Sequence, residues 1–189
     1  EIHNRITVAD SFDDVVSALG NIKKLNMELH VNTVVNRQNM ADLKRTADLL
    51  SSFAPLNHKL SLVEPSGFFE GNRDSLLERP SVLAGYAKET VSYGVGRHSA
   101  GGMTFGLEGF SLCHIRGFER YVDNLFTHGI EYMSEAYEGE FFPVDHGPRI
   151  YPEKCLGCAL RESCPGVYKG FVETYGDEDI FPLDRSKRL

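Results

Sequence analysis

Three cysteines stand close together in the last quarter of the chain, and their spacing is that of a metal-binding loop. They are Cys155, Cys158 and Cys164, in the pattern Cys-x2-Cys-x5-Cys. Thiolates at this spacing can hold one metal centre from a single loop, and glycines such as Gly157 let backbone N–H groups approach the sulfurs. Pro165 follows the last cysteine, as it does in one of the ferredoxin sequences. A metal centre in this loop needs a fourth ligand.

The remaining cysteine, Cys113, lies far upstream and precedes His114. Together the four cysteines predict one site with four thiolates. A [4Fe–4S] cluster takes four thiolates and tolerates a distant fourth ligand. Zinc does so too, but its ribbons usually pair two Cys-x2-Cys motifs and this chain has one. Two disulfides are the third possibility, which is typical of small secreted domains. The spacing favours iron–sulfur and leaves zinc and disulfides open.

Amphipathic helices are predicted to anchor both cysteine segments. The helix after the loop ends at Gly176, and its buried face consists of Tyr168, Phe171, Val172 and Tyr175. A second helix is predicted over residues 118–126, downstream of Cys113. Residues 131–144 are acidic and aromatic, and we expect them to pack the cysteine lobe against the rest of the protein.

The first part of the chain alternates helix and strand patterns. Helical spacing covers residues 12–25, and a second helix begins at Asn39. Residues 28–35 predict a strand buried on both faces, and residues 59–63 a second strand. This order predicts an α/β fold, either an open parallel sheet or a (β/α) barrel, with ligands at the carboxyl ends of the strands. Glu64 stands at such an end, although a loop cap or a lysine partner explains it equally well.

Composition and charge argue against several functional classes of protein. The chain has a formal net charge of −7 and no basic stripe, which argues against a nucleic-acid partner. It has no membrane-spanning apolar run and no signal peptide, so a reducing cytoplasm is the expected location. Residues 93–110 are rich in glycine and lack a hydrophobic period, which predicts a loop that lines a site. A nucleotide-binding loop is rejected, because no Gly-Lys-Ser/Thr follows.

These segments resemble the later half of a radical S-adenosylmethionine (AdoMet) enzyme. Cys113 with the Cys155-x2-Cys158-x5-Cys164-Pro-Gly loop resembles the twitch or SPASM-like extension that carries an auxiliary [4Fe–4S] cluster. The order of barrel strands followed by a cysteine lobe carries the resemblance, which covers nearly the whole chain. The barrel-like segments are residues 1–14 (after the fourth strand of a (β/α)6 partial barrel), 31–39 (the fifth strand and its loop) and 60–65 (the sixth strand).

The resemblance implies a partial (β/α) barrel over residues 1–92 and an auxiliary-cluster extension over residues 93–189. It implies that all four cysteines ligate one cluster, and that Asn32 and Glu64 lie near AdoMet in the intact enzyme. That enzyme would cleave AdoMet reductively, with ferredoxin or flavodoxin as reductant. It would abstract hydrogen from an unknown substrate, a peptide or a small molecule.

The chain departs from the family in two ways. It lacks the Cys-x3-Cys-x2-Cys motif of the AdoMet-cleaving cluster, and it lacks the Gly-Gly-Glu motif of the second strand. Because the sequence opens at Glu1, we expect both motifs upstream and an exposed sheet edge where earlier strands belong. This chain alone should not cleave AdoMet. The alternative reading is a zinc-stabilised binding module without catalysis.

Overall fold

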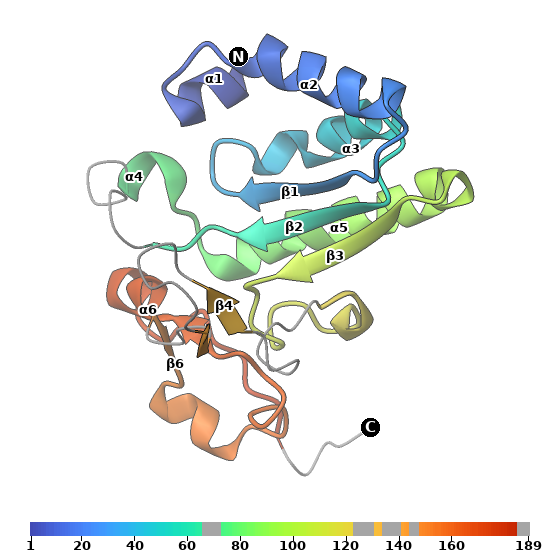
Figure 1. Ribbon diagram of the computed structural model, residues 1–189. Helices are drawn as coiled ribbons and strands as arrows, with labels where there is room; N and C mark the ends of the chain where they lie inside the picture. Colours follow the sequence, from blue (N-terminus) through green and yellow to red (C-terminus); the bar gives the residue numbers. More distant parts are fainter. Residues whose placement is uncertain (66–72, 123–130, 134–140, 144–147, 185–189) are drawn as a thin grey trace.

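The structure is a computed structural model, and it describes residues 1–65, 73–122, 131–133, 141–143 and 148–184 (Figure 1). Helices, short 3-10 turns (η) and strands alternate along the chain. In order they are α1 (Ile2–Thr7), α2 (Phe12–Lys24), β1 (His30–Val35), η1 (Met40–Asp42), α3 (Leu43–Ser51), β2 (Asn57–Leu62), α4 (Arg73–Leu76), α5 (Pro80–His98), η3 (Ser99–Gly101), β3 (Thr104–Glu108), η4 (Glu119–Tyr121), β4 (Glu131–Met133), β5 (Phe141–Pro143), β6 (Arg149–Ile150), η6 (Glu153–Gly157), β7 (Val167–Tyr168) and α6 (Lys169–Tyr175).

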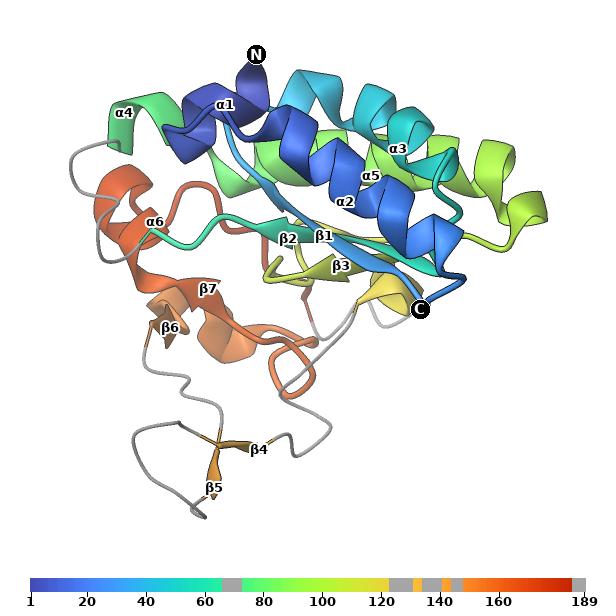
Figure 2. The ribbon, with the colours of Figure 1, turned by 45° about the horizontal axis from the view of Figure 1, so that its top comes forward.

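The central sheet has three parallel strands in the order β1-β2-β3. His30 of β1 is paired with Asn57 of β2, and Asn57 is paired with Thr104 of β3, so the strands begin level with one another. Helices α2, α3 and α5 lie along one side of this sheet (Figure 2). Among the residues that the structure describes, no α-helix covers the other side of the three strands (Figure 2).

The hydrophobic core fills the space between the sheet and its helices. Strand side chains alternate between the two faces of a sheet, and here the helix-facing set is mostly apolar, with His58 and Thr33 as a hydrogen-bonded polar pair within it. From the strands it includes Val35, Leu60, Leu62, Phe105 and Leu107, and from the helices Leu43, Ala47, Leu83, Ala84, Ala87 and Val91, all of which are buried. β1 is less buried than predicted, because only Val35 of its residues is buried. The prediction of a strand covered on both faces was therefore wrong.

The predicted glycine-rich loop over residues 93–110 is wrong. Residues 93–98 continue α5, and Thr104–Glu108 forms the third strand of the sheet. Gly94 explains why residues 93–98 lack the apolar spacing of a helix although they are helical. A Cβ on Gly94 would lie 2.0 Å from Cζ of Phe105, so the helix approaches β3 closely only because this residue has no side chain. The predicted division between residues 92 and 93 falls inside α5.

The cysteine lobe packs near the carboxyl ends of β2 and β3 (Figures 1 and 2). Its β6 and β7 form an antiparallel pair, and α6 follows β7 directly. Gly170 of α6 lies against Pro65, which follows β2: a Cβ at Gly170 would stand 2.7 Å from the Pro65 carbonyl oxygen. The helix ends at Gly176, whose φ of 67° confirms the predicted stop.

The helix predicted over residues 118–126 is not formed where the structure describes it. The short turn η4 ends at Tyr121, and Val122 is extended and forms an isolated bridge with Leu107 of β3. The remainder of that prediction lies outside the described residues, as does most of the acidic and aromatic segment over residues 131–144.

The predicted fold class is confirmed at the coarser level of a mixed α/β protein with a parallel sheet. Across the described ranges the strands form an open sheet and no closed barrel. None of the helices in those ranges has the length and apolar character needed to cross a membrane.

Candidate functional site

All four cysteines line one small cavity in the cysteine lobe. Cys113 comes from the turns after β3, Cys155 from η6, Cys158 from the residue after η6, and Cys164 from the turn before β7. The cavity is about 20 Å³ in volume, which suits about one water molecule. All four thiols are free, so the structure contains neither of the two disulfides. The structure therefore brings the predicted metal ligands together around one space.

Backbone N–H groups point at three of the sulfurs, and that of Phe181 points at Cys113. The amide of Leu112, next to Cys113, donates to Cys164 Sγ at 3.5 Å, and the amide of Leu183 donates to Cys158 Sγ at 3.4 Å. The second bond exists because the C-terminal segment returns beside Cys158 and pairs with it. Such bonds favour thiolate over thiol and are characteristic of the surroundings of metal-bound cysteines.

Burial and mutual repulsion keep the four thiols protonated unless a positive charge compensates them. The pKa of Cys113 is raised to about 11, mainly by burial and also by the neighbouring sulfurs of Cys164, Cys155 and Cys158, against the opposing effect of a backbone hydrogen bond from Phe181. Burial also raises the pKa of Cys155 and of Cys164. Four thiolates in one buried space repel one another, so they ionise together only when a cation compensates them.

Two arginines stack on tyrosine rings near the thiols: Arg161 lines the cavity, and Arg149 lowers the pKa of Cys164 through its charge. Arg161 Cζ is 5.4 Å from the centre of the Tyr151 ring, and Arg149 Cζ is 4.0 Å from that of Tyr168. The Tyr151 hydroxyl also donates to the Cys164 carbonyl oxygen at 2.6 Å. These contacts fix the turn that carries Cys164 and place positive charge next to the sulfurs.

The four thiols have the number and chemistry of the ligands of a four-thiolate metal centre. Within the described ranges, no three His, Cys, Asp or Glu side chains converge on the position of a single metal ion. The four thiols instead surround the cavity from two segments of the chain.

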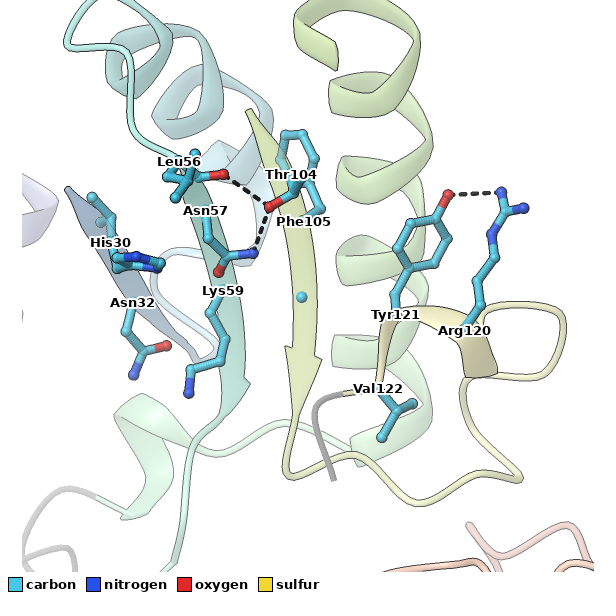
Figure 3. Close-up of a pocket in the computed structure, with 12 residues that line it drawn as sticks. His30, Asn32, Leu56, Asn57, Lys59, Thr104, Phe105, Arg120, Tyr121 and Val122 are labelled. Atoms are coloured by element: carbon cyan, nitrogen blue, oxygen red, sulfur yellow. Dashed lines mark hydrogen bonds between the residues drawn. The ribbon is translucent and has the colours of Figure 1, made fainter. Parts of the chain in front are cut away.

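The face of the sheet opposite the helices is polar, and a pocket of about 690 Å³ lies over it. Figure 3 shows Asn32 of β1 and Lys59 of β2 next to each other at this pocket. The Ser61 hydroxyl lies 2.7 Å from Asn32 Oδ1 and 3.1 Å from Glu108 Oε2. Lys59 Nζ forms an ion pair with the same Glu108 oxygen at 2.8 Å. Hydrogen bonds therefore join all three strands on this face.

Sequence reasoning singled out two residues near this face. Asn32 lies on the polar face and lines the pocket. Glu64 follows the end of β2 and is exposed, outside the set that lines the pocket. Sequence reasoning missed Lys59, Ser61 and Glu108. The alternation of polar residues in β2 was a usable signal for the first two, but Glu108 belongs to a strand that was not predicted.

Tyr168 links the cysteine lobe to the sheet. A Cβ on Gly109, which follows β3, would stand 3.2 Å from both the Tyr168 hydroxyl oxygen and Leu62 Cβ, so Tyr168 packs closely against this glycine. Burial raises the pKa of Tyr168, and Glu64 and Glu108 raise it further, whereas Arg149 lowers it. Arg149 also donates to the Gly109 carbonyl oxygen at 3.3 Å. The lobe thus contacts the carboxyl edge of β3 through the Tyr168 phenol and the Arg149 guanidinium.

A buried carboxylate fixes the lobe to the helical layer. Asp179 accepts hydrogen bonds from the Ser81 backbone N–H, at 2.9 Å, and from the Ser81 hydroxyl, at the start of α5. His114, adjacent to Cys113, donates from Nε2 to the Asp179 carbonyl oxygen at 2.6 Å. The turn that carries Cys113 is therefore connected to α5 through Asp179.

Comparisons with protein-family models, with curated proteins and with solved structures each found no match to this chain.

Proposed function

We propose that this chain is the C-terminal part of a radical AdoMet oxidoreductase, in which Cys113, Cys155, Cys158 and Cys164 hold one auxiliary [4Fe–4S] cluster. The observation that carries the proposal is the single cavity lined by all four thiols, from two segments that are distant in the sequence. The N–H donors of Leu112 and Leu183 add support, because they compensate negative charge on metal-bound sulfur.

The sheet supports the barrel part of the proposal. In a partial barrel the face opposite the helices lines the interior, and here that face is polar and carries the pocket. β3 adds a third parallel strand after β2. If β3 is the sixth strand of a six-stranded partial barrel, β1 and β2 become the fourth and fifth strands, one earlier than the sequence resemblance placed them. Asn32 then lies inside the barrel, and Glu64 at its carboxyl edge.

When bound, such a cluster supplies one-electron chemistry. The chain's own residues would ligate it through four thiolates, donate N–H bonds to three of the sulfurs, and shield it with Tyr151, Leu160 and Ile180, which line the cavity. Four thiolates close the site, which favours electron transfer or a structural role over direct binding of the substrate. Cleavage of AdoMet needs the Cys-x3-Cys-x2-Cys motif, which this chain does not contain, so we expect the chain alone to be inactive.

The test is anaerobic reconstitution with iron and sulfide, followed by metal analysis and visible absorption. We expect a brown protein with four irons per chain. Each single Cys→Ala variant should lose most of the iron and become more sensitive to protease, because metal binding and folding are coupled at such sites. Leu156→Ala is the matched control: Leu156 lies between two of the cysteines, is 60% exposed, and should keep full iron.

Two results would contradict the proposal. A colourless protein that holds stoichiometric zinc would support the zinc-stabilised binding module instead. Full iron and an unchanged spectrum in Cys113→Ala, with loss in the other three variants, would show that the fourth ligand is another group.

A further inference from the structure

The pocket on the polar face of the sheet presents two basic side chains, those of Lys59 and Arg120, in a chain whose formal net charge is −7. None of the described residues that line it is Asp or Glu, although Glu28 lies 2.6 Å from the His30 ring and Glu108 pairs with Lys59. The amides of Asn32 and Asn57 add neutral hydrogen-bonding groups. The lining is therefore rich in N–H donors, and basic side chains attract anionic ligands.

Lys59 is the cation best placed to act on a ligand. Its side chain is 25% exposed, and its ammonium group is held 2.8 Å from Glu108 Oε2. An ammonium group has three N–H donors, so it can hold a carboxylate of the protein and an anion at the same time. Partial burial removes competing water and strengthens each of these contacts. Glu108 therefore positions the Lys59 ammonium without closing the pocket.

Gly106 leaves room for a ligand beside Lys59. A Cβ at Gly106 would stand 3.7 Å from Cγ of Lys59 and 3.9 Å from the amide nitrogen of Asn57, at ordinary contact distance. The space directly over these two side chains is therefore open because position 106 has none. Asn57 donates one N–H to Thr104 Oγ1 at 2.9 Å (Figure 3), and an amide group has a second N–H to offer.

We propose that this pocket binds a small organic anion, with a carboxylate or phosphate group, and that Lys59 is the residue that pairs with its charge. The proposal does not depend on the proposed function, because it is argued from the contacts of Lys59, Asn57 and Gly106. The pocket includes the first residue of each strand, His30, Asn57 and Thr104, whereas the cysteine lobe packs near the carboxyl ends of β2 and β3. It is therefore a site separate from the thiol cavity.

The test is titration calorimetry of the chain with inorganic phosphate and with succinate, and with glycerol as a neutral control. We expect saturable binding of at least one anion and none of glycerol. Lys59→Gln should weaken that binding about tenfold or more, since it removes a charge-assisted hydrogen bond. Gly106→Leu should weaken it by filling the pocket without a change of charge. Lys44→Gln removes an exposed lysine that pairs with Glu89 on the helical layer, and it should bind as the wild type does.

Tighter binding of phosphate assigns the site to phosphate-bearing ligands, and tighter binding of succinate assigns it to carboxylates. The proposal is overturned if neither anion saturates, or if Lys59→Gln loses no more affinity than Lys44→Gln. If Lys59→Gln does not fold, as judged by circular dichroism, Gly106→Leu decides alone, and unchanged affinity in that variant overturns the proposal. Iron content is measured on the same samples. A colourless protein that binds the anion refutes only the iron–sulfur proposal, and a brown protein that binds none refutes only the anion site.

Discussion

Replacement of Gly94 by alanine should destabilise the protein, although the same change is favourable elsewhere in the same helix. Gly94 lies in α5 and faces the Phe105 ring of β3. A Cβ at this position would stand 2.0 Å from Cζ of that ring and 2.5 and 2.6 Å from two further ring carbons. Real Cβ atoms are not found this close to other carbons, so either the ring or the helix must move.

The magnitude follows from two opposing effects. Alanine in a helix interior is favoured over glycine by about 1 kcal/mol. Overpacking of a buried site costs about 1–3 kcal/mol, and the upper part of that range applies here. Phe105 is only 6% exposed and packs against the His58 ring at 5.7 Å, so its ring has no open space to enter. We therefore expect Gly94→Ala to lower the free energy of unfolding by about 1–2 kcal/mol.

The assay is urea unfolding followed by far-ultraviolet circular dichroism, because the chain has no tryptophan for fluorescence. Gly85→Ala and Gly96→Ala are matched controls in α5, since a Cβ at either position meets nothing within 4 Å. They should raise stability by up to about 1 kcal/mol. Phe105→Leu in the Gly94→Ala background should recover part of the loss. Equal stability of Gly94→Ala and Gly85→Ala would refute the packing of α5 on β3.

Two further predictions concern buried polar groups. Burial lowers the pKa of His58 from 6.5 to about 4, so its neutral ring favours the fold fully above pH 6.5 and less as the pH falls towards 4. Between about pH 7 and pH 5, protonation linked to His58 should lower the free energy of unfolding by about 2 kcal/mol. Urea unfolding at the two pH values should therefore show a smaller loss of stability in His58→Leu than in the wild type, and an equal loss would contradict the prediction. Asp179→Ala should cost about 1–2 kcal/mol, because it removes the cap of α5, whereas Asp179→Asn keeps an acceptor and should cost less. Asp177→Ala, which breaks an exposed pair with Lys154, is the control, and equal unfolding midpoints for all three variants would contradict the capping role.

The spacing of apolar residues within a segment predicted those helices and strands whose buried face can be recognised from that segment alone. The apolar spacing of α2 and the β-branched run of β1 were sufficient, as was Gly176 at the end of α6. β3 could not be predicted in this way. Its neighbourhood is rich in glycine because α5 and the lobe approach the strand closely at Gly94 and Gly109, and such contacts have no local signature.

The candidate site also has one part that the sequence predicted and another that it could not predict. The spacing and number of the cysteines predicted that Cys113 joins the loop, and the structure places all four thiols on one cavity. Sequence reasoning had no means to find the Leu183 amide on Cys158, since the two residues meet only when the C-terminal segment returns to the lobe. The pairing of Lys59 with Glu108 was likewise hidden, because it crosses from β2 to the strand that was not predicted.

The contact between Tyr168 and Gly109 bears on how this protein can vary in evolution. Gly109 has a φ of 83°, and a Cβ there would lie 3.2 Å from the Tyr168 hydroxyl. A larger residue at position 109 therefore strains the backbone and requires its neighbours, Tyr168 among them, to shift. In any set of homologous sequences the two positions should change together, with glycine retained wherever tyrosine is present. This covariation would report contact between the sheet and the cysteine lobe without any structure.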